Sequence, residues 1–162
     1  MTYQKKLEGE KVGVVFGTFA PMHQGHLDVI MRAKKECDGG CIVIASGRDN
    51  DRGGNLIPIK KRYRYIREFF ADDDLVSVYA IDESELNIPE YPNGWNSYMN
   101  EVDNIVTNAV LCTCNPIYVF YVSEPEYAQE LKRRGYEAVL LDRYRPNQLR
   151  QNRFQKAKRF GD

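Results

Sequence analysis

The sequence predicts a doubly wound α/β fold, in which helices cover both faces of a five-stranded parallel sheet. Short apolar runs rich in β-branched residues alternate with amphipathic stretches along residues 12–141. Clusters of glycine, proline, asparagine and aspartate separate these segments. The alternation shows no internal repeat, and it is typical of parallel strands joined by right-handed helical crossovers.

The first strand is predicted at residues 12–16, where the run VGVVF stops at Gly17. A short apolar run without polar alternation is typical of a parallel strand that is buried on both faces. Apolar residues at helical spacing then predict a helix over 25–37, which a Gly-Gly pair ends. A second strand is predicted at 41–45.

A helix is predicted over residues 59–70, after a loop rich in Gly, Asp and Arg at 46–55. Its periodicity predicts one apolar face and one basic face. The apolar face holds Tyr63, Ile66, Phe69 and Phe70, and the basic face holds Lys60, Lys61, Arg62, Arg64 and Arg67.

The third strand is predicted at 75–81, and an irregular segment with two prolines follows at 82–95. Long connections inside a compact domain usually carry function. Asn96 is a candidate N-cap for a helix that runs to Val110, because asparagine side chains accept hydrogen bonds from the first turn.

The fourth strand is predicted at 116–122. Pro125 lies between two glutamates, which is typical of the first turn of a helix. Proline needs no hydrogen-bond acceptor there, and acidic side chains favour the positive end of the helix dipole. This helix is expected to end at Gly135, and the fifth strand follows at 138–141.

Composition and length predict one soluble cytoplasmic domain. Of the 162 residues, 43% are apolar and 28% are charged, which excludes a disordered tail or a disulfide-rich miniprotein. The apolar run at 117–122 is too short to span a membrane, and residues 1–10 lack the apolar core of a signal peptide. We expect a polar N-terminal extension at 1–10, a domain at 11–143 and a basic helical tail at 144–162.

The cysteines at positions 37, 41, 112 and 114 are expected to be buried reduced thiols. Their spacing does not match a zinc finger, and no histidine follows at ligand distance. The sequence therefore predicts no metal site formed by the protein.

Net charge is zero but unevenly distributed. Residues 143–162 carry seven basic side chains and one acid, which gives +6, so residues 1–142 carry −6. A solvated C-terminal helix is the simplest interpretation, and binding of nucleic acid or of an anionic ligand is the alternative.

A ligand of this fold is expected at the carboxyl ends of the parallel strands. Five segments follow those ends, and they contain most of the candidate functional residues. They are Gly17-Thr18-Phe19, Ser46-Gly47-Arg48, Asp82-Glu83, Ser123-Glu124 and Asp142-Arg143.

Both histidines of the protein, His23 and His26, follow the first strand at the start of a predicted helix. A helix N-terminus presents unpaired N–H groups and a partial positive charge to an anion. Residues three apart share one helix face, and Gly25 lets a ligand approach the backbone. The pattern favours phosphate binding over two unrelated surface or core histidines, and the spacing disfavours a zinc site of the HExxH type.

The segment at 17–26, GTFAPMHQGH, resembles the GxFxPxHxGH signature of the nucleotidylyltransferase superfamily. Four further segments resemble the NadR-type nicotinamide mononucleotide (NMN) adenylyltransferase domain. They are SGRDNDRG at 46–53, KRYRYIREF at 61–69, YPNGW at 91–95 and EPEY at 124–127. The resemblance covers roughly residues 10–143 and implies a single-domain, Rossmann-like nucleotidylyltransferase fold.

The resemblance implies transfer of AMP from ATP to the 5′-phosphate of NMN, with NAD and pyrophosphate as products and Mg²⁺ accompanying ATP. Such chemistry depends on alignment and charge neutralisation more than on proton transfer. The implied catalytic residues are His23, His26 and Arg150. The implied substrate-binding residues are Gly17, Thr18, Phe19, Ser46, Gly47, Trp95, Ser123 and Glu124.

The resemblance also gives some of these residues a specific role. His23 and His26 would hold the phosphates of ATP, and Ser123 and Glu124 would border its adenosine. The ring of Trp95 would stack on the pyridine of NMN, with a core anchor as the alternative.

The sequence departs from the family after the fifth strand. Family members carry a second phosphate motif of the form I-S-x-T-x-x-R, whereas residues 144–150 read YRPNQLR. Arg150 keeps the arginine, but Arg145 and Asn147 stand at the hydroxyl positions. Loss of a hydroxyl donor can cost roughly 2–4 kcal/mol of transition-state stabilisation. Arg48 and Arg52 are further candidates for phosphate contacts, with a solvated charged loop as the alternative.

Three functions stay open at this point: an active NMN adenylyltransferase, an adenylyl- or cytidylyltransferase with another phosphorylated acceptor, and a catalytically weak nucleotide-sensing module. The expected partners are ATP, NMN and NAD, and we expect no binding to a membrane. Nucleic acid is expected only as a variant of the third function. We expect a stand-alone transferase domain. Its oligomeric state stays open, with a homo-oligomer among the options.

Overall fold

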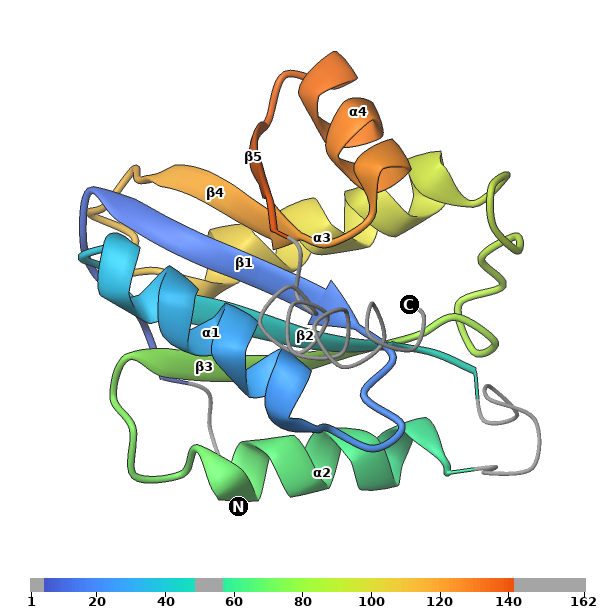
Figure 1. Ribbon diagram of the computed structural model, residues 1–162, viewed down its shortest axis with the longest axis horizontal. Helices are drawn as coiled ribbons and strands as arrows, with labels where there is room; N and C mark the ends of the chain where they lie inside the picture. The colour runs from blue at the N-terminus through green and yellow to red at the C-terminus, as the bar shows by residue number, and fades with distance from the viewer. Residues whose placement is uncertain (1–4, 49–56, 142–162) are drawn as a thin grey trace, which may run out of the picture.

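A computed structural model describes residues 5–48 and 57–141 (Figure 1). Helices and strands alternate strictly along these residues. In chain order the elements are β1 (Lys11–Gly17), α1 (Gln24–Glu36), β2 (Cys41–Gly47), α2 (Ile59–Phe69), β3 (Val76–Asp82), α3 (Trp95–Ala109), β4 (Ile117–Val122), α4 (Pro125–Arg133) and β5 (Glu137–Leu140).

The five strands form one parallel sheet in the order β3-β2-β1-β4-β5. The chain first builds outward from β1 to β3 and then returns to place β4 on the other side of β1. Val14 at the centre pairs with Ile42 of β2 and with Phe120 of β4. The fold class that the sequence predicts is therefore confirmed, and the strand order changes direction between β1 and β4.

Helices α1 and α2 cover one face of the sheet, and α3 and α4 cover the other (Figure 1). Successive strand residues point to opposite faces, so one strand supplies both cores. In β2, Ile42 and Ile44 pack with α3, whereas Val43 packs with α1 and α2. This double burial is the reason that the strands read as continuous apolar runs.

The prediction that Asn96 caps α3 is wrong. Gly94 is the N-cap, and no side chain donates or accepts a capping hydrogen bond there. A Cβ atom on Gly94 would lie 2.1 Å from the carbonyl oxygen of Pro89, so close backbone packing requires a glycine at this position. Asn96 lies inside the helix, where its Oδ1 accepts a hydrogen bond of 2.7 Å from Arg134.

The described part of the N-terminal extension packs against the domain. Leu7 is 2% exposed, belongs to the core beneath α3 and pairs with Val110 through an isolated parallel bridge. Lys5 donates hydrogen bonds to the carbonyl oxygens of Phe70 and Asp73. This segment therefore contributes to the core despite its polar composition.

The expectation of four buried thiols is partly wrong, because Cys37 and Cys41 are buried but Cys112 is exposed and Cys114 is half-buried. Burial raises the pKa of the Cys37 thiol. No disulfide links these four cysteines. Among the helices of residues 5–48 and 57–141, none is both long and apolar enough to cross a membrane.

Candidate active site

A cleft with a volume of about 990 Å³ opens at the carboxyl edge of the sheet, where the strand order changes direction. Ligands of open α/β sheets bind in this position. Its walls include every predicted site residue that the structure describes. These are Gly17, Thr18, Phe19, His23, His26, Ser46, Gly47, Trp95, Ser123 and Glu124.

The turn between β1 and α1 forms the centre of the cleft wall. Phe19 adopts a φ of 50°, a left-handed conformation that is rare for a residue with a side chain. Its ring is buried, and it lies 4.5 Å from the ring of His26 between centroids. Strained backbone of this kind tends to occur at functional sites. The packing of the Phe19 ring fixes where the turn presents its backbone.

The two histidines cap the helix that they begin. His23 is the N-cap of α1, and its Nδ1 accepts a hydrogen bond of 3.1 Å from the N–H of Gly25. Nδ1 of His26 accepts one of 3.0 Å from the N–H of His23. The two rings stack with centroids 3.8 Å apart.

This capping geometry fixes the tautomer of both rings. A neutral imidazole carries one proton, and a nitrogen that accepts a hydrogen bond cannot hold it. Because Nδ1 of each ring accepts a backbone N–H, the proton of each neutral ring is on Nε2. Both rings line the cleft, so their Nε2–H groups are suited to donate to anionic oxygen atoms.

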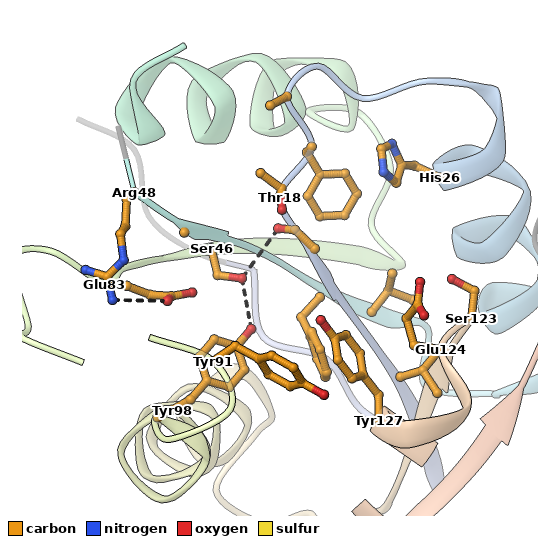
Figure 2. A pocket seen from close by; sticks show the side chains of 18 of the residues that line it. Thr18, His26, Ser46, Arg48, Glu83, Tyr91, Tyr98, Ser123, Glu124 and Tyr127 are labelled. Atoms are coloured by element: carbon orange, nitrogen blue, oxygen red, sulfur yellow. Dashed lines mark hydrogen bonds and ion pairs between the residues drawn. The ribbon is translucent and has the colours of Figure 1, made fainter. Parts of the chain in front are cut away.

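Ser46, at the end of β2, takes part in a hydrogen-bond network. Its hydroxyl lies 2.9 Å from the hydroxyl of Tyr98 and 3.4 Å from the carbonyl oxygen of Gly17 (Figure 2). Burial raises the pKa of Tyr98, so its hydroxyl stays protonated and can donate. The network joins β1, β2 and α3 at the floor of the cleft.

Arg48 and Glu83 stand at one end of the cleft, away from His26 (Figure 2). Arg48 follows β2 and Glu83 follows β3, and their charged groups lie 3.8 Å apart. Arg48 also donates a hydrogen bond to the carbonyl oxygen of Ile88. Both side chains are about four-fifths buried, with exposed fractions of 20% and 22%.

Three aromatic rings form a cluster on the wall of the cleft nearest α3 and α4. The ring of Tyr127 lies 5.5 Å from Trp95 and 5.7 Å from Tyr91, and Trp95 lies 6.2 Å from Tyr91. Burial and nearby charges, among them Glu126 and Glu124, raise the pKa of both tyrosines. The cluster therefore presents neutral aromatic faces in a negative environment, which suits a cationic aromatic ring.

Ser123 and Glu124 lie at the carboxyl end of β4, on the side of the cleft that His26 occupies (Figure 2). Glu124 is the N-cap of α4, and Pro125 takes the first helical turn as predicted. Ser123 is half-buried and Glu124 is exposed. The carboxyl ends of β1 and β4 thus bring the histidines and these two polar residues to the same side.

The assignment of Arg62 to the basic face, opposite the apolar face of α2, is wrong. Arg62 is 2% exposed, and its side chain donates hydrogen bonds to the carbonyl oxygens of Thr18 and Ser46, two residues that line the cleft. The spacing of Ile59, Arg62 and Ile66 already places all three on one helix face, and all three are buried. Phe69, predicted on the apolar face, is instead 51% exposed.

Two of the predicted site residues, Arg52 and Arg150, lie outside the described residues, as does the segment at 142–143. Within residues 5–48 and 57–141, no three His, Cys, Asp or Glu side chains gather in a way that could hold a metal ion. Tyr91 and Tyr127 belong to the segments YPNGW and EPEY but received no role from the sequence, and Tyr98 was not identified as a candidate. Tyr98 follows Trp95 by three residues, and this helical spacing is the signal that could have identified it.

Known proteins share the sequence pattern and the fold of this chain. The family described as "Cytidylyltransferase-like" matches residues 14–141. The trifunctional NAD biosynthesis/regulator protein NadR of Salmonella typhimurium is 26% identical over 140 residues, which are 82% of this chain and 33% of that protein. The chain therefore spans about a third of the length of this curated relative.

Two solved structures share a higher sequence identity with this chain than the Salmonella protein does. NadR in complex with NR superposes with a TM-score of 0.76 at 37% identity, over 95% of this chain and 43% of that one. NadR in complex with NAD and AMP-PNP superposes with a TM-score of 0.72 at 37% identity, over 94% of this chain and 44% of that one.

Proposed function

Because this chain belongs to the cytidylyltransferase-like family of nucleotidylyltransferases, we propose that it transfers AMP from ATP to NMN, giving NAD and pyrophosphate. The observation that carries the proposal is one cleft with two chemically different ends. The stacked imidazoles lie at the end suited to a triphosphate, and the aromatic cluster around Trp95 is suited to a pyridinium ring. The NadR structures in complex with NR and in complex with NAD and AMP-PNP support ligands that contain nicotinamide or adenine.

The reaction exchanges one phosphoanhydride bond for another. A phosphate oxygen of NMN forms a bond to the α-phosphorus of ATP, and the bond from that phosphorus to the oxygen that links it to the β-phosphorus breaks. The electron pair of the broken bond stays on pyrophosphate. Negative charge therefore builds up on the departing phosphates, and no proton has to leave the attacking oxygen.

The side chains of the cleft act in this reaction by alignment and charge. The Nε2–H groups of His23 and His26 donate to phosphate oxygens at the N-terminus of α1, where the helix dipole adds positive potential. Toward the other end, Trp95 holds the ring of NMN, and the phosphate of NMN extends back to the α-phosphorus of ATP beside the histidines. Holding both substrates in line can supply much of the rate enhancement.

Mg²⁺ is expected to enter with ATP. Magnesium keeps several water ligands and is commonly bound through substrate phosphates and one or two carboxylates. Glu83 and Glu124 in the wall of the cleft are the carboxylates proposed to approach such an ion. When bound, the ion neutralises charge on the triphosphate.

One incubation tests the proposal. The purified chain is mixed with ATP, MgCl₂ and NMN, and NAD is measured by an enzyme-coupled assay alongside pyrophosphate. We expect both products in equal amounts. Absence of NAD while wild-type protein binds both substrates would refute the proposal.

His26→Ala is the first variant, because it removes one donor and one cap together. We expect NAD formation to fall by at least about a hundredfold, the effect of losing one donor to a developing charge. Arg32→Ala is the matched control, since Arg32 lies on the same helix but its side chain pairs with Glu36 on the surface. Equal rates for wild type and His26→Ala would show that the wrong group has been assigned.

The alternative acceptors are tested in the same assay. Replacing NMN by nicotinate mononucleotide or by another phosphorylated small molecule, and ATP by CTP, measures which pair gives the highest kcat/KM. The departure at residues 144–150 favours the remaining hypothesis, a weak nucleotide-sensing module. Tight nucleotide binding without any release of pyrophosphate would support that function.

A further inference from the structure

Arg62 is a buried charged side chain whose hydrogen bonds end on the backbone of the candidate site. Its Nη1 donates to the carbonyl oxygen of Thr18 at 2.8 Å and to that of Ser46 at 3.3 Å. Its Nη2 donates to the carbonyl oxygen of Arg48, and its Nε to that of Ile57 at 2.9 Å.

Three of these carbonyls belong to the carboxyl ends of two neighbouring strands. Thr18 directly follows β1. Ser46 lies one residue before the end of β2, and Arg48 directly follows that strand. All three residues line the cleft. One guanidinium therefore holds the two strand ends together at the point where they leave the sheet and its regular hydrogen bonding.

The opposite face of the sheet carries a second link between the same strands. There the Ser46 hydroxyl lies between the carbonyl oxygen of Gly17 and the hydroxyl of Tyr98. Arg62 reaches the site from α2 and Tyr98 from α3, on opposite faces of the sheet. The strand ends are thus held from both faces.

We propose that Arg62 is a positioning residue that fixes the relative placement of the β1 and β2 ends, and so aligns the two substrates with each other. The inference rests on the proposed function. The turn after β1 leads to the imidazoles, and the segment after β2 carries Arg48. Each half of the cleft keeps its own contacts if the link is cut, but a shift of about 1 Å between the halves can cost on the order of a hundredfold in rate.

Arginine is suited to this role in a way that lysine is not. Its planar group offers five N–H donors in a fixed fork, whereas an ammonium group is a compact point donor. Arg62→Lys keeps the charge but cannot span the carbonyls of Thr18, Ser46 and Arg48 together. Burying an arginine carries a large desolvation cost, so its presence needs a compensating benefit.

The test compares Arg62→Lys and Arg62→Met with two controls on the same helix. Arg64→Met changes an arginine whose side chain is 72% exposed, and Ile66→Ala destabilises the core at a fully buried position. For each variant, kcat and both KM values are measured per folded molecule. Arg62→Lys is expected to lower kcat about tenfold to a hundredfold, with each KM within about threefold of wild type. Ile66→Ala is expected to lower Tm at least as much while keeping kcat.

A second measurement does not depend on turnover. Amide hydrogen exchange is expected to accelerate at least about tenfold at residues 17–19 and 46–48 in Arg62→Lys, and not in Ile66→Ala. If Arg62→Lys keeps the wild-type kcat and its amide exchange is unchanged, the inference is overturned. It is also overturned if Arg62→Lys fails to fold, because the role of Arg62 would then be structural. If the wild type forms no NAD, the proposed function fails, and the exchange data still decide whether Arg62 holds the strand ends.

Discussion

Trp95 occupies a position in which stacking on a ligand and packing in the core are both physically reasonable. It is the first residue of α3, its side chain is half-buried, and its ring meets Tyr127 edge to face at 85°. Its ring also meets that of Tyr91 edge to face at 68°, so neither tyrosine stacks face to face on it. Because Trp95 lines the cleft, we expect its main contribution to be binding of the NMN ring.

Trp95→Ala should raise the KM for NMN by roughly tenfold or more, because stacking of a base on an aromatic side chain contributes roughly 1–3 kcal/mol. Trp95→Phe should restore most of the affinity, and the KM for ATP should stay near wild type in both variants. Steady-state kinetics with each substrate varied in turn measures this. Tyr65→Ala is the control, since Tyr65 is 54% exposed on α2. An unchanged KM for NMN would favour another acceptor.

At the scale of elements, an ion pair joins the helices on one face of the sheet. Lys34 in the last turn of α1 contacts the carboxylate of Asp73 in the connection between α2 and β3. Burial raises the pKa of Asp73, but Lys34 and the N–H of Leu75 lower it more, so the net pKa lies below the ordinary value of 3.8. The folded state therefore favours the ionised carboxylate.

This shift predicts a pH-dependent contribution to stability. A carboxylate with a lowered pKa stabilises the folded state fully above its unfolded pKa, and the stabilisation is lost as the pH falls through the folded value. Asp73→Asn should reduce the free energy of unfolding by about 1 kcal/mol at pH 7, with the difference from wild type vanishing below the folded pKa. Urea unfolding at several pH values measures it. The exposed neighbour Asp72, changed to Asn, should show no such difference.

At the scale of the whole molecule, the cleft gathers residues that are distant in the sequence. The turn after β1, the ends of β2 and β4 and the start of α3 all contribute to its walls. Because the two proposed substrates bind at different ends, each should stabilise the fold on its own. Binding to the native state alone raises the unfolding free energy by mass action.

AMP-PNP with Mg²⁺ and NMN should each raise Tm, by about 5–10 °C at a hundredfold excess over Kd, and together they should raise it further. His26→Ala should lose the shift with AMP-PNP and keep the shift with NMN, whereas Trp95→Ala should show the reverse. Differential scanning fluorimetry measures these shifts. Loss of both shifts in either variant would mean that the two ends are not separate sites.

Local sequence patterns predicted which strands and helices exist, but they predicted the residues at which these elements begin and end less accurately. The strand at 12–16 and the helix with Pro125 in its first turn follow from hydrophobic periodicity and from proline chemistry, and both are present. Asn96 has the right side chain for a cap, yet Gly94 takes that position because the carbonyl of Pro89 approaches too closely for a Cβ atom. Such an approach depends on packing between distant segments, which no local pattern encodes.

By itself, the sequence determined the alternation of strands and helices, the five-stranded sheet and the edge at which the cleft opens. Hydrophobic periodicity and the positions of glycine and histidine are local properties of the chain. Tertiary structure decided that Arg62 lies inside the wall of the site, that Tyr98 reaches Ser46, and that Leu7 completes the core beneath α3. A charged side chain is normally solvated, and the carbonyls of strand ends far apart in the sequence offer Arg62 acceptors that compensate for its burial.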